Sequence, residues 1–534
     1  MIKVRQIKVD VKEDSDKLLK EKLLKKLNIE NKHLIDYKIV KKSIDARDKS
    51  RVYYVYELNV NLDNEDIILK KNNSDICKTT EEKYESPISG SEELVERPII
   101  VGSGPSGLFA ALLLAENGYK PIVIERGEQI EERVKSVETF WEKNILNKNS
   151  NVCFGEGGAG TFSDGKLNTL VGDSKCRIRK VFESFVECGA PSDILYINKP
   201  HIGTNILRSV IVNLRNKIID LGGEFLFNTT LTDIKYNDNK IESIVVNDNK
   251  EIKTSILILA LGHSAKDTIT MLYNHGIKMS SKPFAVGIRI QHSQNMINES
   301  QYGEYANYLP AASYKLTYTT SKNRGVYSFC MCPGGYVVNS TCEEEHLIIN
   351  GMSNHERNSG NSNSAIVVTV DEKDFGNNPL DALEYQRKLE SLSYKACAGK
   401  IPTQLLKDYF DNKASEKLGS IKPMFKGEYS LTNINNLLPD YINEALKEAI
   451  KDFDKKIKGF ACHDAIISCV ESRTSSAIRI ERDENFETNI KGIYPIGEGA
   501  GYSGGITTSA VDGIKIAEKI IAKYTNKNIK DWFI

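Results

Sequence analysis

A glycine turn placed directly after a short apolar strand is the feature that most constrains how this 534-residue chain can fold. Arg97–Val101 is apolar like a buried strand, Gly102–Gly107 has the pattern GxGxxG, and Leu108–Glu116 has the composition of a helix. A second apolar strand, Pro121–Ile124, follows and ends at Glu125. Strand, turn, helix and strand in this order predict a βαβ unit, whose strands are parallel. We therefore expect an α/β fold.

The three glycines of this turn have separate roles in the dinucleotide-binding pattern. Gly102 permits the tight turn, Gly104 lets the backbone approach a pyrophosphate, and Gly107 allows the helix to pack closely on the strand. The free N–H groups at the start of the helix attract the phosphates. Glu125 follows Gly102 by 23 residues and is placed to accept hydrogen bonds from an adenosine ribose. The pattern predicts a site for the ADP half of a dinucleotide.

A second glycine-rich element lies almost 400 residues later. Gly492–Gly505 contains a short apolar strand and Glu498 between glycines, and it precedes a helical segment at Ile506–Ile521. A simple NAD-binding domain does not need a second polar element of this kind, whereas a flavin that extends across the sheet does. Gly155–Gly160 also fits GxGxxG, but neither a helix nor an acid-terminated strand follows, so it is interpreted as a loop whose amides approach a ligand.

Bulk properties exclude several other classes of protein. The 72 basic residues balance 72 acidic ones, which argues against a broad nucleic-acid or anionic-lipid surface. No stretch approaches the roughly 20 apolar residues of a membrane span, and the first residues lack the apolar block of a signal peptide. The 10 cysteines show no zinc-like spacing. We expect a cytoplasmic protein with reduced thiols, no metal site, no membrane association and no nucleic-acid partner.

Changes in composition along the chain predict five segments. Residues 1–62 have the pattern of a small α/β unit, with a strand at 2–11, a helix at 14–27 and strands at 34–44 and 52–62. Residues 63–95 are polar and are interpreted as a linker. The nucleotide-binding domain is expected in two parts, 96–280 and 456–526, with a substrate domain of mixed α+β structure inserted at 281–455.

The two glycine elements together resemble the glutathione-reductase-type FAD fold, a Rossmann-like fold. The resemblance implies that the first turn binds the ADP pyrophosphate, that Gly497 and Glu498 meet the ribityl-pyrophosphate, and that the final helix, preceded by Gly505, points at the flavin pyrimidine. That family more often has Asp where this chain has Glu498. Leu231 matches the position whose backbone meets the adenine, and Gly262 ends a strand like the family's Ala-Thr-Gly. The cofactor-binding residues expected in all are Gly102, Gly104, Pro105, Ser106, Gly107, Glu125, Arg126, Gly160, Ser163, Leu231, Gly262, Gly497, Glu498, Gly505 and Ile506.

A closer resemblance covers essentially the whole chain. Cys153–Leu167, Ser328–Gly335 and Glu471–Ser476 resemble runs in a bacterial and plastid family of uncharacterised FAD-dependent dehydrogenases. This resemblance implies the fold and noncovalent FAD, but no particular reaction. A separate NAD(P)H-binding unit is absent from the sequence pattern, so a nicotinamide donor would have to dock transiently in the substrate cleft.

Six residues are candidates for chemistry beside the flavin. Lys166 is a candidate for stabilising the anionic reduced flavin, with a surface lysine as the alternative. Guanidinium groups form bidentate hydrogen bonds with carboxylates, so Arg289 and Arg473 are candidate anchors for an anionic substrate. Structural ion pairs are the alternative for both residues. His292 is a candidate proton donor, although a single histidine is more often structural.

Cys330 and Cys332 stand two apart in a predicted strand, so both side chains are expected on one face. Because they lack the CxxC spacing of disulfide reductases, the pattern favours two core thiols over a redox pair.

The function expected from these features is flavin-dependent oxidation or reduction of a small, anionic organic molecule. Two alternatives remain open at this point: a flavin-dependent tRNA-modifying enzyme, and a flavin-binding redox sensor without turnover.

Overall fold

The computed structural model describes residues 1–71, 73–169, 171–527 and 529. Its central sheet has five parallel strands in the order β25-β12-β6-β7-β8. These strands are β6 (Ile99–Val101), β7 (Ile122–Ile124), β8 (Glu224–Leu226), β12 (Leu257–Leu259) and β25 (Ile493–Pro495). All five are short, and all except the edge strand β8 are fully buried, as expected for strands with helices on their faces. The parallel sheet predicted from the first glycine turn is therefore present.

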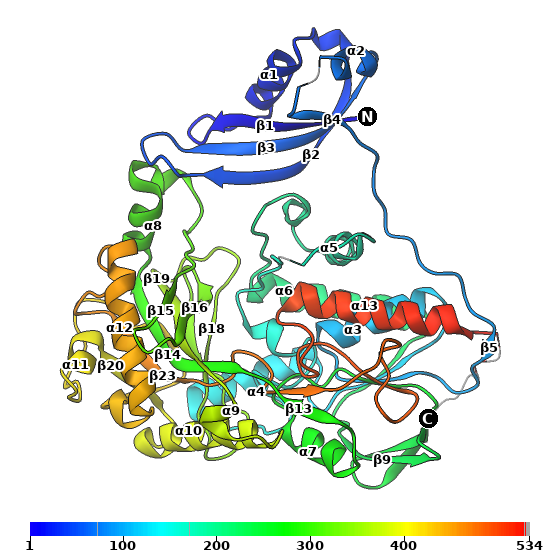
Figure 1. Cartoon of the computed structure of the whole chain (residues 1–534), viewed down its shortest axis with the longest axis vertical. Coiled ribbons are helices and arrows are strands. Elements are labelled where there is room, and N and C mark those ends of the chain that lie inside the picture. Colours follow the sequence, from blue (N-terminus) through cyan, green and yellow to red (C-terminus); the bar gives the residue numbers. More distant parts are fainter. Residues whose placement is uncertain (72, 170, 528, 530–534) are drawn as a thin grey trace.

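Two helices that follow the glycine elements lie side by side on this sheet. They are α3 (Pro105–Glu116), which follows β6, and α13 (Ile506–Lys523), which follows β25 (Figure 1). The helices approach closely at Gly513, where an added Cβ would lie 2.1 Å from the Ser106 carbonyl oxygen. Pro105 occupies the first turn of α3, where its missing N–H costs nothing. The starts of both helices, 401 residues apart in sequence, consequently share one edge of the sheet.

A second sheet of seven strands forms the inserted part, in the order β15-β16-β19-β14-β23-β20-β22. Its centre is β14 (Phe284–Ser293), antiparallel to both β19 (Asn361–Val370) and β23 (Ile466–Glu471). The remaining strands are β15 (Thr317–Thr319), β16 (Gly325–Cys332), β20 (Ile401–Leu405) and β22 (Tyr429–Leu431). Because β23 lies inside this sheet, the inserted part extends beyond residue 455, where the composition had placed its end.

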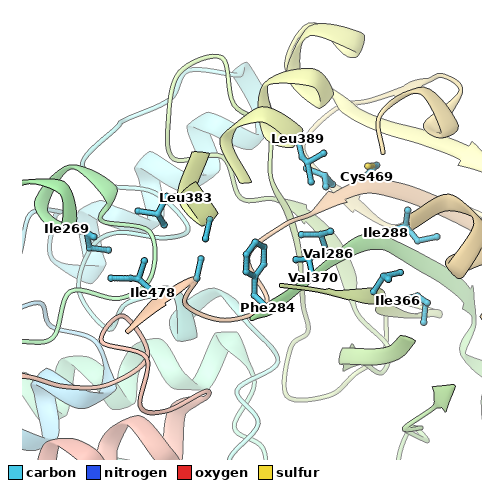
Figure 2. Packing of buried hydrophobic residues seen from close by; sticks show 14 of the residues in the cluster. Ile269, Phe284, Val286, Ile288, Ile366, Val370, Leu383, Leu389, Cys469 and Ile478 are labelled. Atoms are coloured by element: carbon cyan, nitrogen blue, oxygen red, sulfur yellow. The ribbon is translucent and has the colours of Figure 1, made fainter. Parts of the chain in front are cut away.

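Helices of the inserted part cover its sheet and complete the core. Figure 1 shows α10 (Asp381–Cys397) and α12 (Asp440–Lys456) against the sheet. Figure 2 shows the packing: Phe284 and Val286 of β14 lie between Ile478 on one side and Ile288 and Ile366 on the other. Leu389 of α10 belongs to the same buried cluster. The same buried cluster includes residues of the five-stranded sheet, such as Ile99. The two sheets therefore share one continuous hydrophobic core.

The N-terminal unit is a four-stranded antiparallel sheet in the order β2-β3-β1-β4 with its own core. It contains β1 (Ile2–Asp10), α1 (Asp16–Leu27), β2 (Leu34–Asp45) and β3 (Tyr53–Leu62), as the sequence predicted, and also α2 (Glu65–Leu69) and β4 (Ile76–Lys78). Since β4 pairs with β1, this unit continues into the segment interpreted as a linker. The unit touches the rest of the protein where Lys42 exchanges backbone hydrogen bonds of 2.8 and 2.9 Å with Tyr196 and Asn198.

Within the residues described above, no helix is both long enough and apolar enough to cross a lipid bilayer.

Candidate functional site

The starts of α3 and α13 open onto one cavity of about 430 Å³. Its walls come from the first glycine turn, the second glycine element, the loop that contains Gly160, and residues of the inserted part. Thirteen of the predicted cofactor-binding residues line it, together with three of the candidate catalytic residues. The lining residues predicted from the sequence are Gly102, Gly104, Pro105, Ser106, Glu125, Arg126, Gly160, Ser163, Leu231, Gly262, Glu498, Gly505, Ile506, Lys166, Cys330 and Arg473.

Bare backbone faces the cavity at several glycines. An added Cβ at Gly104 would meet only the Gly158 Cα, at 3.9 Å, and at Gly262 or Gly505 it would meet no atom within 4 Å. All three residues line the cavity, so side chains there would project into it. Free N–H groups at the two helix starts add positive potential to this bare surface. The walls thus fit a phosphate-bearing nucleotide that needs close backbone approach.

Gly107 and Gly497 do not line the cavity but bring structural elements together. A Cβ at Gly107 would lie 1.9 Å from the Gly102 carbonyl oxygen, so only glycine allows this helix-to-strand contact. A Cβ at Gly497, whose φ is +77°, would lie 2.5 Å from the Ser106 hydroxyl. Gly497 therefore packs against α3, and the ribityl contact implied for it by resemblance stays a prediction.

Glu125 lies at the end of β7, buried, with its carboxylate at the cavity wall. One carboxylate oxygen accepts from the Ser103 amide (3.0 Å) and hydroxyl (2.8 Å). The other accepts from the amides of Gly127 (2.9 Å) and Gly155 (3.0 Å). Of these four donors only the Ser103 hydroxyl can rotate away, which would leave an acceptor for a hydroxyl of a ligand. The same carboxylate joins the first turn to the Gly155 loop.

Glu498 and Arg126 lie on other parts of the wall. Among the described residues, the Glu498 carboxylate has no hydrogen-bond partner, and burial raises its pKa above the usual range. It is therefore the acidic group of the second glycine element that is available to a ligand. Arg126 also lines the cavity, with its guanidinium 4.5 Å from the centre of the Phe154 ring and 2.9 Å from the Asp267 carboxylate.

Arg289 is completely buried and does not line the cavity. Its guanidinium makes two hydrogen bonds of 2.9 Å to the Glu471 carboxylate and a third of 2.7 Å to Asn363. Because this charge is already compensated by Glu471, the expectation that Arg289 anchors an anionic substrate is not supported. The structural ion pair is the arrangement found.

Arg473 lines the cavity, but its charge is also compensated. It donates to both oxygens of the buried Glu390 carboxylate at 2.8 and 2.7 Å and to the Cys342 sulfur at 3.0 Å. The neighbouring Lys266 adds a further cation 3.3 Å from Glu390. Arg473 therefore stiffens the wall and contributes less positive potential than a free guanidinium.

His292 lies in the core of the inserted part. Its ring is fully buried, its Nε2 lies 2.7 Å from the Phe460 carbonyl oxygen, and burial lowers its pKa to about 4. The expected role as a proton donor to substrate is not supported, because His292 does not line the cavity and its ring is neutral near pH 7.

Lys166 is the cavity-lining cation with the most exposed side chain, at 30%. Its Nζ lies 3.6 Å from the Asp164 carboxylate and donates to the Met331 carbonyl oxygen. Burial alone would lower its pKa, but Asp164 and the thiols of Cys332 and Cys330 outweigh burial and raise it. Lys166 is therefore charged and near the cavity, while Asp164 is held mainly by Arg357 at 3.0 Å.

Some wall residues were not predicted from the sequence. Asn350 and Glu471 come from the inserted part, and Cys153 and Phe154 come from the loop before Gly160. The hydrogen bond from Cys342 and the charge of Arg473 outweigh burial and lower the Cys153 pKa to about 6. Cys153, Phe154 and Glu471 stand at the ends of runs used above for the family resemblance. Asn350 carries no signal in the sequence.

Comparisons with known families agree with this site. Residues 283–474 match the family described as "FAD-dependent protein, C-terminal domain-like", and residues 100–155 match an NAD(P)-binding Rossmann-like domain. Residues 1–61 match a domain of unknown function. The fold and these matches define a flavoprotein of the oxidoreductase class, with a Rossmann-like nucleotide-binding fold and FAD as its cofactor.

An uncharacterized protein of Clostridium beijerinckii (strain ATCC 51743 / NCIMB 8052) is 48% identical over 531 residues, which cover 98% of this chain and 99% of that protein. The chain belongs to the same family as this protein.

Solved structures resemble the chain more distantly. An L-amino acid deaminase from Proteus vulgaris is 13% identical, with 83% of this chain and 97% of that chain covered and a TM-score of 0.32. A halogenase in complex with FAD is 10% identical, with 80% and 69% covered and a TM-score of 0.38. Similarity at this level does not define a shared activity.

Proposed function

We propose that the protein is an FAD-dependent oxidoreductase that oxidises or reduces a small organic acid at the end of the cavity formed by the inserted part. The observation that carries this proposal is the shared wall of a single cavity. The first glycine turn and Glu125 lie on one part of that wall, and Cys330, Asn350 and Glu471 lie on another. A cofactor held by the former would extend toward the latter.

The arrangement of the two helix starts supports a glutathione-reductase-type orientation of the cofactor. The bare turn before α3 would hold the ADP phosphates, and Glu125 would hold the adenosine ribose. Glu498, without a partner, would accept a hydroxyl of the ribityl chain. Gly505 and Ile506 line the cavity at the start of α13, whose positive dipole favours negative charge at that end.

Lys166 is the residue of this chain best placed to stabilise the negative charge that a flavin gains when it is reduced. FAD supplies the two-electron chemistry when bound. Lys166 would hold negative charge at the cavity end through its charged Nζ, and Asp164 would fix the position of that Nζ. Since Arg289 and Arg473 are compensated by buried carboxylates, Lys166 is also the group expected to attract the carboxylate of a substrate.

Purified protein tests this proposal directly. The cofactor is released and identified, and the FAD-loaded protein is mixed without oxygen with NADH, NADPH and a panel of small organic acids. We expect one class of donor to reduce the flavin rapidly, with a nicotinamide acting only transiently if it acts at all. A protein that binds FAD and is reduced by dithionite, but by no donor of the panel, would contradict the proposed substrate class.

Variants of two lysines sharpen the test. Lys166→Met should retain FAD but slow its reduction and shift its midpoint potential downward, because the reduced anion loses a nearby positive charge. Lys180→Met is the matched control, since Lys180 forms a 2.7 Å ion pair with Glu116 away from the cavity. Equal potentials in the two variants would remove Lys166 from the proposed role.

A further inference from the structure

Cys330 and Cys332 lie at an irregularity in strand β16. Phe329 pairs with Ala365 and Cys332 pairs with Asn363, so one extra residue is accommodated between these two pairs. Cys330 adopts a φ of +42°, a left-handed conformation that is uncommon for a side chain other than glycine or asparagine. A β-bulge of this kind bends the strand and redirects a side chain.

The bulge changes what the two thiols can do. In a regular strand, residues two apart are separated by about 6.6 Å, near the upper limit of the Cα separation that a disulfide spans. Here the three steps from Phe329 to Cys332 lie opposite only two steps on β19, so Cys330 and Cys332 are closer together than in a regular strand. The Cys332 sulfur also lies 3.3 Å from the Cys330 carbonyl oxygen. The pair is therefore closer to bonding geometry than its spacing in sequence predicts.

The surroundings make the two thiols unequal. Cys330 lines the cavity, whereas Cys332 is fully buried. The hydrogen bond from Cys332, assisted by the charges of Lys166 and Arg289, lowers the pKa of Cys330 although burial opposes this. The same hydrogen bond and burial raise the pKa of Cys332. Cys330 is therefore the more acidic of the two thiols and faces the cavity, and Cys332 is the less acidic thiol buried behind it.

We propose that Cys330 and Cys332 form a redox-active pair that exchanges two electrons with the FAD in this cavity. In the oxidising direction, the Cys330 thiolate and the Cys332 thiol form one S–S bond and release two electrons and the Cys332 proton. Oxidised FAD, when bound in the cavity, would accept both electrons and that proton. The reverse transfer breaks the S–S bond and returns the pair to one thiolate and one thiol. This proposal rests on FAD occupying the cavity but does not depend on the substrate class.

A second pair of thiols provides the contrast. Cys153 lines the cavity and Cys342 is buried behind it, close to Arg473. Cys153 lies beside Phe154 and Gly155, and the Gly155 amide bonds Glu125 on the expected ribose side. Cys330 instead shares its part of the wall with Lys166, Asn350 and Glu471 of the expected flavin-ring end. The position in the cavity therefore favours Cys330 and Cys332 as the pair that communicates with FAD.

Anaerobic titration of the FAD-loaded, oxidised protein with dithionite counts the electrons accepted per FAD. We expect four electrons in the natural protein, two for FAD and two for the disulfide, and two electrons in the Cys330→Ser/Cys332→Ser double variant. The control is Cys188→Ser/Cys397→Ser, two buried thiols outside the cavity, which should still accept four. Two electrons in the natural protein would overturn the proposal.

Alkylation of free thiols followed by peptide mass mapping gives an answer independent of activity and of FAD. The oxidised full-length protein should contain one Cys330–Cys332 disulfide that reappears as two free thiols after reduction. A disulfide mapped to Cys153 and Cys342, or no disulfide, would refute the assignment. Single Cys332→Ser protein, which retains the cavity-facing thiol, serves if the double variant fails to fold. Loss of FAD in every preparation would instead contradict the proposed function.

Discussion

Replacing Gly104 by valine tests whether the first glycine turn holds the cofactor. Gly104 has φ −72° and ψ −179°, an extended conformation that valine adopts readily. Its Cβ would meet no atom closer than the Gly158 Cα at 3.9 Å, so the fold should tolerate the change. The two methyl groups would instead occupy cavity space and keep phosphates from the N–H groups that begin α3. Each hydrogen bond to a charged group contributes roughly 1.5–3 kcal/mol. Losing two would weaken FAD binding by about 3–6 kcal/mol, on the order of 10²–10⁴-fold.

The assay is titration of cofactor-free protein with FAD, followed by the change in flavin fluorescence. Circular dichroism and thermal unfolding establish that the variant is folded. Gly107→Ala is the contrasting control, because its Cβ would lie 1.9 Å from the Gly102 carbonyl oxygen and must displace backbone. That variant should lose stability as well as FAD. A folded Gly104→Val protein whose FAD affinity is within tenfold of the natural protein would refute the assignment of this turn.

Three further predictions follow from the described contacts. Heat or acid should release intact FAD; a peptide carrying a covalent flavin by mass spectrometry would contradict noncovalent binding. Arg289→Met should lower the free energy of unfolding by about 3–5 kcal/mol, because the substitution leaves Glu471 buried and unpaired. The double variant Arg289→Met/Glu471→Leu should recover most of the lost free energy. Equal denaturation midpoints for the single variant and the natural protein would contradict this prediction. Burial lowers the pKa of His292 from about 6.5 to about 4, so between these values only the unfolded chain binds the proton. The free energy of unfolding should therefore fall as pH decreases through this window, by up to about 3 kcal/mol, and His292→Gln should show a smaller fall in pH-dependent denaturation.

The nucleotide-binding half of the fold could be predicted from sequence because its determinants are local. Gly102, Gly104 and Gly107 act within a single turn, and the strands on either side are short apolar runs. The N-terminal elements were predictable for the same reason, since each shows its own strand or helix periodicity. The role expected of Gly107, close packing of the helix on the strand, depends only on residues of the same turn. In the structure Gly107 makes this contact against the Gly102 carbonyl oxygen.

The catalytic candidates were harder to predict because their environments depend on partners far away in the chain. Arg289 and Glu471 are separated by 182 residues, and Arg473 and Glu390 by 83 residues. No local pattern reveals that these guanidinium groups are already paired. The bulge at Cys330 likewise depends on how β16 pairs with β19, which the sequence does not reveal. The spacing of Cys330 and Cys332 alone therefore favoured two core thiols. Strand β23 joined the inserted sheet for the same nonlocal reason.

The separation of the two cavity-forming elements also affects how the protein is made. Glu125 and Ile506 lie 381 residues apart in the chain, yet both belong to one cavity wall. At a synthesis rate of about 5–20 residues per second, the first element leaves the ribosome roughly 20–80 s before the second is translated. During that interval the growing chain has a nucleotide turn but no complete enclosure. Stable capture of FAD must therefore follow translation of α13, so the cellular FAD concentration at that moment helps determine how much of the protein matures.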